Sequence, residues 1–189
     1  MGLRNQLLLD IYRDKASVFT SQGIALSFGS GLEREKIKSR MIAYVRKGQI
    51  LNPRKGVFAK QGYDPRELSC LLYTPSYISL EYVLQRSGII FQDSDGITAV
   101  GNLSRTLQID GETYRYRKIK AEILFDTSGI IREGGVNIAT PERAFLDTLY
   151  LEQNYFFDNT SPLSKGKVLE LLPLYDCKAL NQRVKQILG

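Results

Sequence analysis

Residues 31–48 read GLEREKIKSRMIAYVRKG, and residues 49–59 continue with QILNPRKGVFA. The apolar side chains of the first stretch recur at the spacing of one helix face: Ile37, Met41, Tyr44 and Val45. They predict an amphipathic helix with a buried stripe, which ends at Gly48. Two short apolar runs then flank Arg54-Lys55-Gly56, a pattern typical of a β-hairpin with a basic tip.

Two shorter segments upstream complete this pattern. Residues 3–14 place five apolar side chains on one helical face: Leu3, Leu7, Leu8, Ile11 and Tyr12. Thr20 or Ser21 is predicted to cap a second short helix that ends near Gly29. Short helices, the last of them basic, followed by a basic hairpin are typical of a winged helix-turn-helix. We therefore predict that residues 1–62 form such a DNA-binding domain.

The charge of the chain is divided unevenly. The net charge is +6, yet residues 1–62 contain 12 basic and four acidic residues, whereas the remainder contains 14 and 16. Such an asymmetry suggests that the first part meets a polyanion. The alternatives are a solvated basic face without a partner, or a face that docks an acidic protein or RNA.

The predicted basic helix supplies the candidate DNA contacts. Base or groove contacts are predicted on the face that carries small and basic side chains: Lys36, Ser39, Arg40 and Ala43. Phosphate contacts are predicted for the other cations of the helix and hairpin: Arg34, Lys38, Arg46, Lys47, Arg54 and Lys55.

Residues 63–189 are predicted to form a second domain of mixed character. Strand-like runs occupy residues 96–103, 106–109, 113–119, 123–125 and 136–139. Asp110-Gly111 is typical of a hairpin turn, and Thr140-Pro141-Glu142 of a helix start. The predicted fold class is therefore α+β: a winged helix-turn-helix followed by a small antiparallel sheet with flanking helices.

The residue types present exclude several kinds of chemistry. The chain has no histidine, so the Ser-His and Cys-His nucleophile systems and histidine metal ligands are excluded. Cys70 and Cys177 are too few for a thiolate zinc site. Asp93-Ser94-Asp95 lacks the later ligands of a calcium loop. We predict no catalytic residue, metal or cofactor, and expect a non-enzymatic protein.

No apolar run approaches the roughly 18 residues that a membrane span needs. The N-terminal residues lack the long apolar stretch of a signal peptide. We therefore expect a cytoplasmic protein without a membrane partner.

Three motifs follow one another in a familiar order. They are Arg54-Lys-Gly-Val-Phe-Ala59, Tyr73-Thr-Pro-Ser-Tyr-Ile-Ser-Leu-Glu-Tyr82 and Ile138-Ala-Thr-Pro-Glu-Arg-Ala-Phe-Leu-Asp147. Together with the predicted winged helix, this order resembles the AbiEi family, the antitoxins and transcriptional regulators of abortive-infection AbiE systems. The resemblance covers roughly residues 3–150.

The resemblance implies a protein with two tasks. The N-terminal domain would bind inverted repeats in its own promoter and repress the operon. The C-terminal domain would counter a nucleotidyltransferase-like toxin without forming a stable complex with it, as in type IV toxin–antitoxin systems that confer phage resistance. The alternative is a stand-alone transcriptional regulator whose C-terminal domain senses a ligand or another protein.

Overall fold

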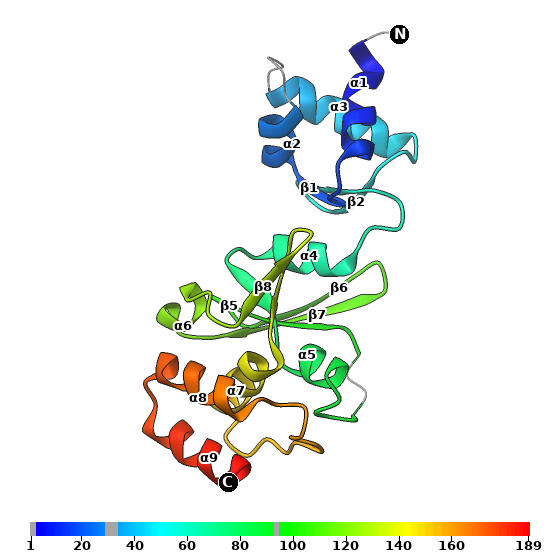
Figure 1. Cartoon of the computed structure of the whole chain (residues 1–189). Helices are drawn as coiled ribbons and strands as arrows, with labels where there is room; N and C mark the ends of the chain where they lie inside the picture. Colours follow the sequence, from blue (N-terminus) through cyan, green and yellow to red (C-terminus); the bar gives the residue numbers. More distant parts are fainter. Residues whose placement is uncertain (1–2, 29–33, 93–94) are drawn as a thin grey trace. The chain divides into compact units, whose positions relative to one another are not determined.

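The computed structural model describes residues 3–28, 34–92 and 95–189, and the chain divides into two compact units, Met1–Leu71 and Leu72–Gly189 (Figure 1). The predicted features at Gly29, Asp93 and Ser94, and the side chains of Leu3 and Arg34, lie outside the described residues.

The first unit extends beyond the boundary expected at residue 62. It takes in all but the last residue of helix α4 (Pro65–Leu72). The buried Glu67 carboxylate explains this, because it binds the segment between the first two helices of the unit. It accepts hydrogen bonds from the backbone N–H groups of Ser17 and Val18, at 2.6 and 3.0 Å, and from the Ser17 hydroxyl at 3.0 Å.

The first unit combines helices with short strands. Before α4 they are α1 (Leu3–Arg13), β1 (Val18–Thr20), α2 (Ser21–Phe28), α3 (Arg34–Arg46), β2 (Leu51–Arg54) and β3 (Val57–Ala59). One hydrophobic core joins them: Leu7, Ile11, Phe19, Ile24, Ile37, Met41, Tyr44, Ile50 and Phe58. The stripe predicted for α3 is confirmed, since Ile37, Met41 and Tyr44 are buried and Val45 packs against the core.

The three strands form an antiparallel sheet in the order β1-β3-β2. The predicted hairpin is confirmed between β2 and β3, where Gly56 has a φ of +81°. The Asn52 amide closes the hairpin by donating to the carbonyls of Arg54 and Val57, at 2.8 and 2.6 Å. Strand β1 was not predicted, because a three-residue strand shows no alternation of its own.

The second unit is built on a six-stranded sheet. Its strands are β4 (Ser76–Ile78), β5 (Ile97–Gly101), β6 (Arg105–Ile109), β7 (Glu112–Lys118), β8 (Ile130–Glu133) and β9 (Val136–Ala139). Its helices are α5 (Glu81–Arg86), α6 (Ala121–Phe125), α7 (Pro141–Leu151), α8 (Lys165–Leu171), a 3₁₀ turn (Leu172–Tyr175) and α9 (Lys178–Leu188).

The observed structure of the second unit corrects two predictions, one about its sheet and one about residues 123–125. Its order is β6-β7-β5-β4-β9-β8, and the pairs β5–β7 and β4–β9 are parallel, so the sheet is mixed and not a small antiparallel one. The tight β6–β7 hairpin at Asp110-Gly111, both with positive φ, returns β7 between β6 and β5. Residues 123–125, predicted as strand, lie in α6, where a run this short does not distinguish the two periods.

Helix α7 begins where the sequence predicts. Thr140 is its N-cap and accepts a hydrogen bond from the backbone N–H of Arg143, with Pro141 in the first turn. The helix is buried from Glu142 to Leu149 and contacts α5, α8 and α9. Among the described residues, none of the helices has the length and apolar character that crossing a membrane requires.

Candidate nucleic-acid interface

The exposed residues of α3 divide between two sides of the helix. Lys38, Ile42 and Arg46 follow one another at intervals of four residues, so they form a single row. A second set occupies another side of α3 and the turn after it: Lys36, Ser39, Arg40, Ala43 and Lys47. Each set borders its own hollow in the surface of the first unit.

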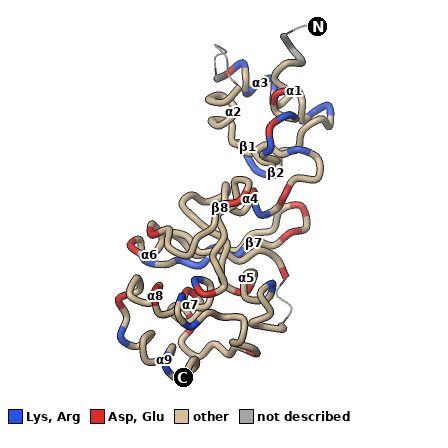
Figure 2. The backbone as a smooth tube through the Cα atoms, in the orientation of Figure 1, with Lys and Arg blue, Asp and Glu red and all other residues tan. Residues whose placement is uncertain are grey.

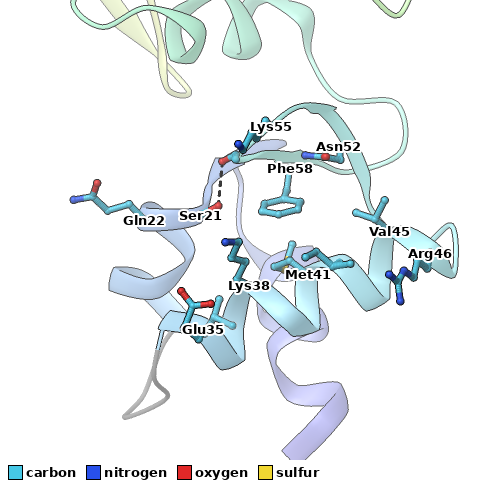
Figure 3. Close-up of a pocket in the computed structure, with 13 residues that line it drawn as sticks. Ser21, Gln22, Glu35, Lys38, Met41, Val45, Arg46, Asn52, Lys55 and Phe58 are labelled. Atoms are coloured by element: carbon cyan, nitrogen blue, oxygen red, sulfur yellow. Dashed lines mark hydrogen bonds between the residues drawn. The ribbon is translucent and has the colours of Figure 1, made fainter.

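The first hollow, which we call the hairpin groove, lies between the start of α2, helix α3 and the β2–β3 hairpin (Figure 3). Its volume is about 850 Å³. Apolar side chains from α3 and β3 form its floor: Ile37, Met41, Val45 and Phe58. The exposed cations Lys38 and Arg46 of α3 and Lys55 of the hairpin tip border it, together with one acid, Glu35.

The hairpin tip is held against the start of α2. Ser21 donates two hydrogen bonds to the carbonyl of Gly56, from its backbone N–H at 3.0 Å and from its hydroxyl at 3.3 Å. The Thr20 hydroxyl accepts from the backbone N–H of Gly23 at 2.9 Å and so caps α2, one of the two caps that the sequence predicted. The backbone next to Lys55 is thereby held against the start of α2.

Three polar residues of the groove were missed by the sequence analysis: Ser21, Gln22 and Asn52. The signal for the first two was present, because a helix start supplies backbone N–H groups that favour anions. The predicted cap at Thr20 or Ser21 marked that start. No local pattern pointed to Asn52, whose amide is engaged in closing the hairpin.

The second hollow, which we call the outer hollow, has a volume of about 600 Å³. The four residues predicted to contact bases, Lys36, Ser39, Arg40 and Ala43, line it with Lys47, Glu35 and Tyr44. The predicted contacts therefore do not form one surface. Lys38, Arg46 and Lys55 border the hairpin groove, whereas Arg54 is half-buried and borders neither hollow.

Basic residues recur along α3 and the hairpin in the first unit (Figure 2). Among the described residues that line the hairpin groove, three are cations and one is an acid. A surface of this kind attracts polyanions, and the width of an α-helix suits the major groove of duplex DNA.

The two later motifs meet inside the second unit, around Asp147 of α7. Its carboxylate, which is fully buried, accepts hydrogen bonds from the hydroxyls of Ser79 and Tyr175, both at 2.7 Å, and of Tyr77 at 3.1 Å. Arg143, also fully buried, lies 3.4 Å from the same carboxylate.

The Arg143 guanidinium ties several segments together. It donates to the Tyr77 hydroxyl at 2.9 Å and to the carbonyls of Ile123 and Ser128, both at 2.7 Å. The network thus joins α7 to β4, α6 and the loop before β8. Because Arg143 and Asp147 have no exposed surface, they can stabilise the fold but cannot contact a partner.

The protonation states of the network follow from its burial. Burial and the adjacent Asp147 carboxylate raise the pKa of the Tyr77 and Tyr175 hydroxyls well above the ordinary value, so both remain hydrogen-bond donors. Burial also raises the pKa of Asp147, against the opposing effects of the Arg143 charge and the three hydroxyl donors.

The part of the chain that the structure describes contains no group of three or more Cys, Asp or Glu side chains that could hold a metal ion. Cys70 is buried, Cys177 is partly buried, and the two form no disulfide.

Comparison with known proteins shows a similarity of fold to a solved structure. No protein-family model matches the sequence, and no curated protein matches it either. The chain is similar to the crystal structure of the RV2827C protein from Mycobacterium tuberculosis, with a TM-score of 0.57. The match covers 100% of this chain and 77% of the RV2827C chain. At 14% sequence identity, this similarity concerns the fold alone.

Proposed function

We propose that the first unit is a winged helix-turn-helix that binds duplex DNA, and that the protein represses its own operon. The element order α1-β1-α2-α3-β2-β3 and the sheet order β1-β3-β2 support this proposal. In this arrangement α3 is the recognition helix and the β2–β3 hairpin is the wing.

The observation that carries the proposal is the convergence of cations from two elements on one groove. Lys38 and Arg46 come from α3, Lys55 comes from the hairpin tip, and all three are exposed. Ser21 and Gln22, at the start of α2, line the same groove. Contacts from a helix, a helix start and a hairpin fix the register of a protein on the phosphate backbone.

The experiment is a titration of fluorescently labelled DNA from upstream of the gene, about 200 base pairs divided into overlapping fragments, against scrambled DNA. Each titration is repeated at several salt concentrations. We expect tighter binding to one native fragment than to scrambled DNA. The salt slope, which is the slope of the logarithm of the binding constant against the logarithm of the salt concentration, should be about −0.9 for each phosphate contacted. Equal affinity for native and scrambled fragments at every salt concentration would contradict the repressor role.

We further propose that the second unit opposes a nucleotidyltransferase-like toxin without a stable complex, as the resemblance to the AbiEi family implies. The support here is the pair of later motifs. Because Arg143 and Asp147 of these motifs are buried, they support the fold of an antitoxin-type domain and leave its contact surface unassigned.

A variant that separates the two tasks tests this second proposal. In the groove variant, Lys38→Ala/Arg46→Ala/Lys55→Ala, all three changes lie in the first unit. We expect it to lose repression of a promoter fusion and still to restore growth of cells that express the nucleotidyltransferase-like toxin proposed as its counterpart. Failure of the wild-type protein to restore growth, at equal expression, would favour the stand-alone regulator.

A further inference from the structure

Ile42 is an apolar side chain in the middle of the cationic row of α3. It is 42% exposed and borders the hairpin groove, between Lys38 one turn before it and Arg46 one turn after it. The adjacent Met41 is fully buried in the core, whereas Ile42 is not part of that core. The row therefore reads cation, branched apolar residue, cation.

The fold gives no reason for isoleucine at this position. A β-branched residue is a weaker helix former than alanine, lysine or glutamate, and an exposed apolar side chain gains little from burial. Val45 and Phe58 of the apolar floor line the same groove as Ile42, but they leave the Ile42 side chain exposed. The side chain is placed to bury its remaining surface against a ligand.

The chemistry of the major groove identifies that ligand. Thymine alone displays a methyl group there, and apolar side chains recognise it by contact. Four residues of α-helix advance about 6 Å. Base pairs stack about 3.4 Å apart along a strand, so Lys38 and Arg46 would reach phosphates or bases about two steps on either side.

We propose that Ile42 is a specificity-determining residue that contacts the C5-methyl group of a thymine in the operator. This inference rests on the proposed DNA-binding function. It assigns base reading to the row that borders the hairpin groove, with Ile42 at its centre, and it adds a residue that charge alone does not select.

Replacement of thymine by deoxyuridine tests the contact directly, because it removes the methyl group and leaves the hydrogen-bonding groups in place. The preferred fragment is first footprinted, and each thymine in the footprint is then replaced singly. Affinities are measured for the full-length wild type, for Ile42→Ala and for the control Leu9→Ala. Leu9 lies on α1, with a similar exposure of 45%, and does not border the groove.

For the wild type and Leu9→Ala, we expect about fourfold weaker binding at one thymine of each half-site, the value for burial of a single methyl group. Ile42→Ala should bind the unmodified site at least fourfold more weakly, and the same deoxyuridine should then cause no further loss. The deoxyuridine series on the wild type changes only the DNA, so it is independent of how the variant folds.

Two results would overturn the inference while the repressor role stands. One is sequence-preferring binding that no single deoxyuridine weakens. The other is a deoxyuridine effect of equal size in the wild type and in Ile42→Ala. Absence of any sequence preference on unmodified DNA is a different result, because it removes the proposed function and the inference with it.

Discussion

The two units of this protein use the same kinds of charged residue in opposite ways. In the first unit, Lys38, Arg46 and Lys55 are exposed around a groove. In the second, Arg143 and Asp147 are fully buried, and hydroxyl and carbonyl groups surround them. A charged motif therefore does not by itself indicate a binding site; its burial and its hydrogen-bond partners decide between recognition and folding.

Arg143 offers the most severe test of the structural role of buried charge in the second unit. Arg143→Ala leaves the Asp147 carboxylate buried without its cation, and we expect the free energy of unfolding to fall by about 3–5 kcal/mol. Chemical denaturation monitored by circular dichroism measures the loss. Arg132→Ala, at an exposed position of β8, is the control and should change stability by less than about 0.5 kcal/mol. Equal effects of the two substitutions would show that the network does not stabilise the second unit.

The first unit also has a buried charge with a structural role, Glu67 of α4. Glu67→Ala removes the acceptor for two backbone N–H groups and one hydroxyl, so we expect a loss of about 1–3 kcal/mol in stability. Thermal unfolding followed by circular dichroism measures it, with the exposed Glu122→Ala as the matched control. An unchanged midpoint would mean that α4 is not anchored to the first unit through this carboxylate.

The smallest predicted effect distinguishes neighbouring cations of the hairpin. Lys55 is exposed at the tip and borders the groove, whereas Arg54 is half-buried and does not. Lys55→Ala should therefore lower the magnitude of the salt slope of DNA binding by about one unit, and Arg54→Ala should leave it nearly unchanged. A larger change in salt slope for Arg54→Ala than for Lys55→Ala would mean that the hairpin contacts DNA through the side that carries Arg54.

Local patterns predicted the elements whose signals lie within a few residues. The α3 stripe, the hairpin with Gly56 at its tip, the Asp110-Gly111 turn and the Thr140 cap all have a physical cause in the adjacent sequence. Strands β1, β4 and β8 were missed because three or four residues show no period. The partners of β1 and β4 are distant along the chain, whereas β8 pairs with the adjacent β9.

The candidate site shows the same limit. Helical periodicity located α3 and its cations, but it did not show which side of the helix the hairpin borders. That side depends on the bonds between Ser21 and Gly56, 35 residues apart. The burial of Arg143 was equally hidden, because arginine is rarely found without exposed surface.

We propose that the hairpin groove, and not the outer hollow, is the DNA-binding face. Two triple variants with the same change in charge test it: the groove variant, and an outer variant, Lys36→Ala/Arg40→Ala/Lys47→Ala. Binding of both to the preferred upstream fragment is measured over a salt series. We predict that the groove variant loses the sequence preference and up to about three units of salt slope, while the outer variant keeps its preference. A loss of sequence preference in the outer variant alone would instead assign DNA binding to the outer hollow.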